Sequence, residues 1–206
     1  VKITDTSDAS VSNVSSNLFA IKGAIQIIQP NGNENFLKGS LQQIQWKPTG
    51  TYPGSVLLEY SNDSGSTWKG IAAPSAGADN VTQTYNWTIP DDIGTTTIVR
   101  VATQIGQTSV DVNDTSNATF KIKGSTQVVA PNGGETWYVG DTNRQIRWNS
   151  VGTVTPVKIE YSVDNGGNWI TITDNYAGIE GANVYNWSVV PDIKSEECLI
   201  KVSDNR

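Results

Sequence analysis

Hydrophobic and polar residues alternate in several short segments, among them IQW (44–46), VLLEY (56–60) and TYNW (84–87). This period of two is typical of strands with one buried face. Clusters rich in Gly, Pro, Asn and Asp separate the segments about every ten residues, and no stretch keeps a helical period beyond a few residues. The pattern therefore predicts an all-β chain.

The same pattern occurs twice, at an offset of 100 to 102 residues. The corresponding pairs are IIQPNGNENFLKGSLQQIQW (27–46) with VVAPNGGETWYVGDTNRQIRW (128–148), VLLEYSNDSGSTW (56–68) with VKIEYSVDNGGNW (157–169), and TYNWTIPDDI (84–93) with VYNWSVVPDI (184–193). About seven short strands per repeat of about 101 residues indicate tandem immunoglobulin-like (Ig-like) or fibronectin III-like β-sandwiches.

The repeat also predicts the domain boundaries. FAIKG (19–23) matches FKIKG (120–124), and VKITD (1–5) matches IKVSD (200–204). We therefore expect the C-terminal strands of an incomplete preceding repeat at 1–23, a complete repeat at 24–124, and a repeat lacking its last strand at 125–206. The joints, Lys-Gly in both cases, have no Pro-rich or Ser-rich spacer, so we expect neighbouring domains to abut and form a stiff rod.

Aromatic residues are expected to fill the two cores in place of a disulfide. Each has an aromatic counterpart in the other repeat: Trp46 with Trp148, Trp68 with Trp169, Trp87 with Trp187, and Phe36 with Trp137. Truncating one core Trp to Ala is expected to cost about 3 to 5 kcal/mol.

Composition limits the function classes. The chain has no histidine and one cysteine, Cys198, which excludes imidazole-based catalysis, Cys/His metal cages and an intrachain disulfide. A net charge of -6 without a basic block excludes nucleic acid as a partner. The longest apolar runs are far below the roughly 18 residues of a membrane helix, so no membrane insertion is expected.

The motifs PNGGETWYVG, IRW, VKIEYSVDNGGNW, YNW and VVPDI resemble the tandem Ig-like repeats of long bacterial and archaeal surface proteins. They are more distantly similar to the Ser/Thr-rich GPI-anchored cell-wall family of fungi. The resemblance covers nearly the whole chain and implies a module reused in stalks, spacers and wall-bound segments.

One turn motif is present in both repeats and looks like the Asp-box of sialidases. It is a hairpin device, in which the Asp accepts backbone N–H bonds, the Gly takes a positive φ and the Trp pins the hairpin to the core. Its members are Asp63, Gly65 and Trp68 in the first copy and Asp164, Gly166 and Trp169 in the second.

Other candidate sites are surface groups. Acidic loops could supply oxygen ligands to calcium, although solvated carboxylates explain them as well; no other cofactor is expected. Unmatched aromatic residues, Tyr52, Tyr138 and Tyr176, could contact a ligand. The calcium candidates are Asp91, Asp92, Asp111, Asn113 and Asp114. The Asn-x-Ser/Thr glycosylation candidates are Asn13, Asn62, Asn80, Asn86, Asn113, Asn117 and Asn186.

Repeats, short joints, acidity and abundant Ser, Thr and Asn favour a non-enzymatic extracellular protein of a surface stalk, surface layer or filament. Its partners would be copies of itself or neighbouring repeats. The alternative is an adhesin or carbohydrate-binding accessory region of a larger secreted protein, with surface glycans as partners. An enzyme is the third hypothesis.

The domain ends carry a further hypothesis. A strand centred on Phe19 and Ile21 could insert head to tail into the open repeat of another copy. The alternative is that the given sequence is an excerpt, in which following residues close the second sandwich in cis.

Overall fold

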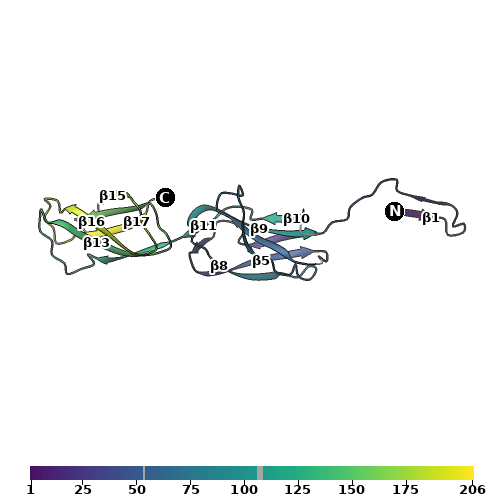
Figure 1. Cartoon of the computed structure of the whole chain (residues 1–206), viewed down its shortest axis with the longest axis horizontal. Coiled ribbons are helices and arrows are strands. Elements are labelled where there is room, and N and C mark those ends of the chain that lie inside the picture. Colours follow the sequence, from purple (N-terminus) through teal and green to yellow (C-terminus); the bar gives the residue numbers. More distant parts are fainter. Residues whose placement is uncertain (53, 106–108) are drawn as a thin grey trace.

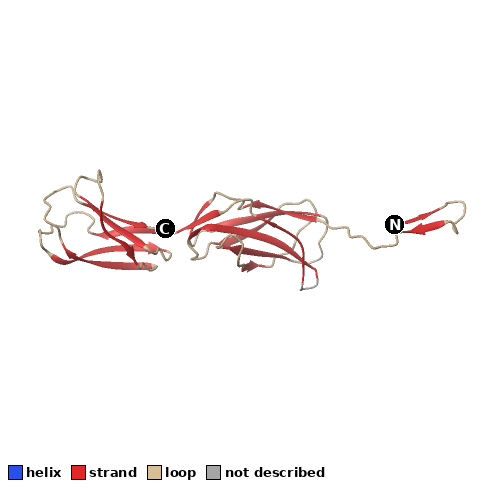
Figure 2. Cartoon of the chain, turned by 90° about the horizontal axis from the view of Figure 1, so that it is seen from above, coloured by secondary structure: helices blue, strands red, loops and turns tan. Residues whose placement is uncertain are grey.

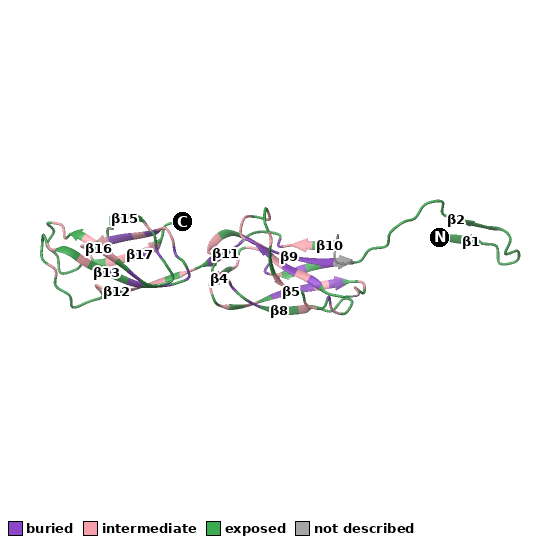
Figure 3. Cartoon of the chain, in the orientation of Figure 1, coloured by how far each residue is buried: buried purple, intermediate pink, exposed green. Residues whose placement is uncertain are grey.

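The computed structural model describes residues 1–52, 54–105 and 109–206, with the backbone alone at 104–105 and 109–111. Two β-sandwiches lie end to end along the long axis, and a small hairpin stands apart at the N-terminal end in both views (Figures 1 and 2). The hairpin pairs β1 (Lys2–Thr4) with β2 (Ser12–Val14). Every residue from 1 to 24 is exposed (Figure 3).

The first sandwich has two sheets that pack face to face. One sheet has the order β3-β5-β8, and the other has the order β4-β11-β9-β6-β7 with β10 also paired to β9. The strands are β3 (Ala24–Gln29), β4 (Asn35–Leu37), β5 (Leu41–Thr49), β6 (Val56–Ser61), β7 (Lys69–Ala72), β8 (Gln83–Thr88), β9 (Gly94–Ile105), β10 (Ser109–Thr115) and β11 (Phe120–Lys123).

The alternating pattern produces this core directly. In β5, Ile44 and Trp46 are each 1% exposed, because successive side chains of a strand point to opposite faces. Leu58 of β6 and Phe120 of β11 meet them from the second sheet, within one cluster. The Trp46 Nε1 atom donates a hydrogen bond to the Ala76 carbonyl at 3.1 Å, so the buried indole is satisfied.

The second sandwich repeats this arrangement with two three-stranded sheets, β12-β13-β16 and β15-β14-β17. Its core contains Ile146, Trp148, Val157 and Ile159. The strands are β12 (Ser125–Ala130), β13 (Thr142–Val151), β14 (Val157–Ser162), β15 (Ile170–Tyr176), β16 (Gly181–Val189) and β17 (Leu199–Asp204). Both sandwiches have the two-sheet architecture of the Ig-like and fibronectin III-like class, antiparallel except for the parallel β4–β11 pair, so the predicted fold class is confirmed.

Candidate functional site: the joint between the sandwiches

One glycine separates the two sandwiches. Strand β11 ends at Lys123 and β12 begins at Ser125. A Cβ atom on Gly124 would lie 2.7 Å from the Val151 carbonyl oxygen and 2.6 Å from a methyl group of Val154. The same Cβ atom would lie 2.8 Å from Ile93 Cδ1 of the first sandwich, so atoms of both sandwiches pack against Gly124.

The apolar part of the joint is Ile93, which lies in the loop between β8 and β9. Its half-buried side chain packs against the hydrophobic clusters of both sandwiches. A Cβ atom on Gly152 would lie 2.8 Å from Ile93 Cδ1, and a Cβ atom on Gly124 would lie equally close. The two glycines thus make room for Ile93, and this one side chain contacts both cores.

The polar part is a carboxylate of the first sandwich that binds a turn of the second. Asp91 accepts hydrogen bonds from the Thr153 backbone N–H, at 2.9 and 3.0 Å to its two oxygens, and from Thr153 Oγ1 at 2.7 Å. Gly152 holds the turn open with a φ of 79°. This pairing joins the β8–β9 loop of the first sandwich to the β13–β14 turn of the second through exposed hydrogen bonds.

Two further contacts lie at the edge of the joint. Lys38 forms an ion pair with Glu180, and Arg206 Nη1 donates to the Ile93 carbonyl at 3.0 Å. The side chain of Glu180 is 49% exposed, and an exposed pair of this kind contributes only about 0 to 1 kcal/mol. Among these contacts, the apolar contact of Ile93 is the one that packs against both buried clusters.

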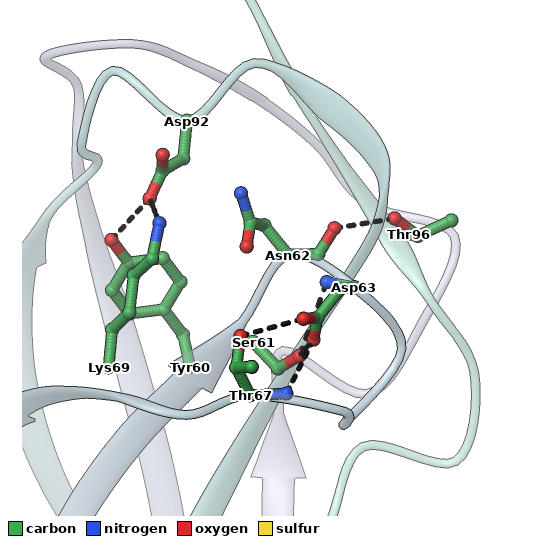
Figure 4. Close-up of polar contacts among 8 residues, drawn as sticks. All are labelled: Tyr60, Ser61, Asn62, Asp63, Thr67, Lys69, Asp92 and Thr96. Carbon is green, nitrogen blue, oxygen red and sulfur yellow. Dashed lines mark hydrogen bonds and ion pairs between the residues drawn. The ribbon is translucent and has the colours of Figure 1, made fainter.

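The predicted turn motif lies at the β6–β7 hairpin (Figure 4). Asp63 accepts bonds from Ser61 Oγ at 2.6 Å, from the Thr67 backbone N–H at 2.8 Å and from Thr67 Oγ1 at 2.6 Å. Gly65 has a φ of 93°. The hydrogen bonds from Ser61 and then Thr67 lower the pKa of Asp63 to about 2. The carboxylate therefore closes the turn.

The β14–β15 hairpin of the second sandwich has the same geometry. Asp164 accepts bonds from the Asn168 backbone N–H at 2.8 Å, from Ser162 Oγ at 2.7 Å and from Asn168 Nδ2 at 2.6 Å. These bonds, the backbone one first, lower the pKa of Asp164 to about 2. Gly166 has a φ of 89°.

The expectation that Trp68 and Trp169 pin these hairpins to the core is wrong. Both rings are half-buried and lie outside the buried clusters. The Arg100 guanidinium covers the Trp68 ring at 4.1 Å, and the Lys201 ammonium covers the Trp169 ring at 4.3 Å. Arg100 also forms an ion pair with Glu59, and Lys201 forms one with Glu160. The two indole rings are therefore covered by cations on the outer face of the sheet.

The carboxylate of Asp92, which was a calcium candidate, is bonded to side chains of the protein near the β6–β7 hairpin (Figure 4). It accepts bonds from Tyr60 Oη at 2.5 Å and from Lys69 Nζ at 2.7 Å. Burial alone would raise the pKa of Asp92, but the bonds from Lys69 and Tyr60 outweigh it and lower the pKa. Burial, and then the bond to Asp92, raise the pKa of the Tyr60 hydroxyl.

The other calcium candidates are separated in space or bonded to the protein. Asp91 binds Thr153, and Asp114 accepts the Ile27 backbone N–H at 2.8 Å. Asn113 is exposed on β10, and the side chain of Asp111 lies outside the described residues. Within residues 1–52, 54–105 and 109–206, no group of three acidic, His or Cys residues comes together as metal ligands. Calcium stays a prediction.

The glycosylation candidates lie on the surface. Asn86 and Asn186 are exposed on strands β8 and β16, between a Tyr and a Trp that face the core, as alternation predicts. Asn13, Asn80, Asn113 and Asn117 are also exposed, and Asn62 is half-buried. Each can present its amide to solvent, and glycosylation itself stays a prediction.

Of the three unmatched tyrosines, Tyr138 is the most exposed. Tyr176 donates its hydroxyl to the Val184 carbonyl at 2.8 Å, and Tyr52 packs against the first core. The strand-exchange candidates Phe19 and Ile21 lie in the exposed segment before β3. Ligand binding by the three tyrosines stays a prediction.

No protein-family model matches the chain, and no curated protein matches it. Solved structures do match. The fibronectin(III)-like modules of CbhA from Clostridium thermocellum are 14% identical, with a TM-score of 0.31 over 79% of this chain and 78% of that one. The titin structure Titin-A168169 is 17% identical, with a TM-score of 0.39 over 87% and 96%.

A third match is the class 5 fimbriae chaperone CfaA, which is 10% identical with a TM-score of 0.26 over 86% of this chain and 98% of that one. The fold itself, the two-sheet Ig-like and fibronectin III-like β-sandwich, is shown by the strand pairing of the chain. In the described part of the chain, no helix has the length and apolar character needed to cross a bilayer.

The contacts of the joint were not predicted from the sequence. Asp91 was singled out for calcium, and neither Ile93 nor Thr153 was singled out at all. A signal was present: Gly-Thr occurs at residues 50–51 and again at 152–153, at the start of the loop after the second long strand of each repeat. In the second repeat this pair forms the turn that binds Asp91.

Proposed function

We propose that the chain is a non-enzymatic spacer, a segment of a stiff rod in an extracellular stalk, surface layer or filament. The observation that carries the proposal is the joint, where Ile93 packs into both cores and Asp91 binds Thr153. Domains joined flexibly need no side chain that contacts both cores. A spacer that fixes the distance and angle between its domains does need such contacts. Domain pairs with small polar interfaces move relative to each other by default.

The composition supports a role without catalysis. The chain has no histidine, and its one cysteine, Cys198, is exposed. The carboxylates with a lowered pKa, such as Asp63 and Asp164, are fully engaged in closing turns. These carboxylates stabilise the turns. A catalytic acid or base, in contrast, must be free to exchange a proton with a substrate.

Small-angle X-ray scattering on the full chain tests the rod. A Gly-Ser-Gly-Ser insertion between Gly124 and Ser125 separates the sandwiches and leaves each sequence intact. The matched control places the same insertion between Gly133 and Gly134, in an exposed loop. We expect the wild type and the control to scatter as one extended particle, and the joint insertion to broaden the distance distribution. A wild type as broad as the joint insertion would contradict the proposal.

A second candidate, carbohydrate binding, rests on one groove. It has a volume of about 370 Å³, lies between the edge strands β7 and β8, and is lined by Tyr60, Tyr85 and Trp87 together with Asn86. Tyr60 and Trp87 are core residues, 7% and 5% exposed, so the half-buried Tyr85 is the aromatic ring with the most surface available to a sugar there. Titration of the ¹⁵N-labelled chain with cello- and chito-oligosaccharides tests this candidate. Shifts centred on the Tyr85 and Trp87 signals would support it, and unchanged spectra at millimolar sugar would remove it.

A further inference from the structure

Strand β8 is an edge of its sheet, and that edge is unprotected. In the order β3-β5-β8, strand β5 pairs with one side of β8, and no described strand pairs with the other side. Natural proteins protect such edges with lysine, proline, a bulge or a very short strand. The register of β8 with β5 is unbroken, and no charged residue lies between positions 81 and 90. The edge lies in the middle of the chain, with sandwich strands before and after it.

The other edges of the first sandwich carry such protection. Strand β4 has only three residues, and both β7 and β10 are paired with a bulge or irregularity. Strand β7 also begins with Lys69. In β3, the Ile27 N–H that points away from β5 is bonded to the carboxylate of Asp114 at 2.8 Å. Among the described edges of this sandwich, β8 is therefore the one prepared for another strand.

Backbone groups at alternate positions of β8 are free. The Ile89 N–H, directly after the strand, donates to the Ser40 carbonyl at 2.9 Å on the β5 side. The N–H and C=O groups of an antiparallel strand alternate between its two sides. The even positions of β8 therefore present their groups at the free edge, where they are a template for pairing. These positions are Thr84, Asn86 and Thr88.

The free edge opens onto the groove between β8 and β7. The groove has a volume of about 370 Å³ and is lined on the β8 side by residues 85–88. On the β7 side it is lined by Gly70, and beyond the chain neighbours no atom lies within 4 Å of the place where a Cβ of Gly70 would be. A strand therefore has room to lie along β8.

The equivalent edge of the second sandwich is covered by its own chain. The Tyr176 hydroxyl of β15 donates to the Val184 carbonyl of β16 at 2.8 Å. Val184 is the counterpart of Thr84, so this bond occupies an edge carbonyl that is free in β8. The first sandwich has Ser75 at the position of Tyr176 and lacks the ring that spans the gap. The two sandwiches thus differ in which edge is available.

The sequence of β8 is complementary to itself. Thr84-Tyr85-Asn86-Trp87-Thr88 has the same order of polar and aromatic residues in both directions. In an antiparallel pair with Asn86 opposite Asn86, Thr84 of one copy lies opposite Thr88 of the other, and Tyr85 lies opposite Trp87. Threonine pairs and aromatic pairs are both favourable across strands. The free backbone groups of the even positions also face one another in this register, as hydrogen bonding requires.

Charge favours a second copy of the chain as the partner. The net charge of the chain is -6, so most contacts between two copies bring acidic surfaces together. Pairing through β8 avoids this repulsion, because residues 81–90 carry no charged side chain. The next acidic residue, Asp91, falls opposite Val81 of the other copy in this register.

We propose that β8 of one copy pairs antiparallel with β8 of a second copy, centred on Asn86, and joins two three-stranded sheets into one continuous sheet. The contact uses the same surface on both copies, so it closes as a dimer. The half-buried ring of Tyr85 becomes covered by Trp87 of the other copy. The dimer goes beyond the proposed rod, since it joins two rods laterally and does not depend on the joint within either.

Three double substitutions test the pairing. Thr84→Lys/Thr88→Lys and Thr84→Glu/Thr88→Glu each place like charges opposite one another in the dimer, whereas Thr84→Lys/Thr88→Glu places opposite charges there. Both positions are exposed, so all three chains are expected to fold. In sedimentation equilibrium, we expect the wild type and the mixed-charge variant to dimerise, and the dissociation constant of each like-charge variant to rise at least about tenfold. An equimolar mixture of the two like-charge variants should recover the affinity.

The matched control is Val184→Lys/Ser188→Lys at the equivalent positions of β16, which should leave dimerisation unchanged. Asn86 is a glycosylation candidate, so all chains are produced in a host that does not attach glycans. A wild type that is monomeric at millimolar concentration would overturn the proposal, and so would equal affinities of the like-charge and mixed-charge variants. A monomeric chain whose Tyr85 signal shifts with oligosaccharide would assign the groove to a sugar instead.

Amide hydrogen exchange tests the register. The N–H groups of Thr84, Asn86 and Thr88 become bonded in the dimer, so we expect their exchange to slow as the concentration rises. The N–H groups of Tyr85 and Trp87 point towards β5 and should exchange equally slowly in monomer and dimer. Slowing at all five positions alike would contradict the register, and a dimer without slowing at the even positions would overturn the proposal. The scattering test of the rod, made below the concentration of dimerisation, reads the joint alone.

Discussion

Ile93→Ala is the substitution that examines the joint most closely. It removes three carbon atoms from a side chain that packs against both hydrophobic clusters. A fully buried carbon contributes about 0.8 kcal/mol, and at a half-buried position about half of that is lost, so the variant should lose about 1.2 kcal/mol. For domains of this size, such a loss lowers the melting temperature by about 4 to 8 °C.

Differential scanning calorimetry of the full chain measures the effect, with the transitions assigned by NMR. Because Ile93 is shared, we expect its truncation to lower the melting temperatures of both sandwiches. The matched control is Ile193→Ala, which lies in the corresponding loop of the second sandwich and is 38% exposed. By the same arithmetic that change costs about 1.5 kcal/mol, and it should lower the melting temperature of the second sandwich alone. If Ile93→Ala left the melting temperature of the second sandwich unchanged, the claim that Ile93 contacts both cores would be refuted.

Two other predictions concern the cores and the hairpins. Trp46→Phe should destabilise by about 1 to 3 kcal/mol more than Trp148→Phe in urea denaturation, because it orphans the buried Ala76 carbonyl, whereas Trp148 Nε1 has no hydrogen-bond partner among the described residues. Equal losses would show that the Trp46 bond contributes nothing. The lowered pKa of Asp63 stabilises the fold above its unfolded value near 3.8, and this stability is lost as the pH falls towards about 2. Carboxyl ¹³C titration should therefore show Asp63 ionised down to about pH 2, and a midpoint near 3.8 would contradict the bonds seen in the hairpin.

The fold was predictable because its signal is local. Alternation around Trp46 and Trp148 is set by the geometry of a strand, and a strand with one buried face places every second residue in the core. The turn motif is equally local, since Asp63 and the N–H it binds at Thr67 are four residues apart. Such features involve residues that are close in the sequence, so they can be predicted from it.

The joint and the outer faces depend on distant residues. Asp91 and Thr153 are 62 positions apart, and their contact exists only once two domains are docked. Trp68 followed the apolar pattern, yet Arg100 from another strand covers its ring on the outside of the sheet. A pattern of hydrophobic positions does not reveal which half-buried aromatic ring is covered by a cation, because the covering residue comes from the sheet pairing.

Residual dipolar couplings measured on the weakly aligned full chain test the central claim, a rigid joint, most directly. Backbone amides of both sandwiches should fit one alignment tensor with the orientation set by the Asp91–Thr153 contact. Two tensors of different magnitude would show that the sandwiches reorient independently, and the chain would then be a flexible tether instead of a rod.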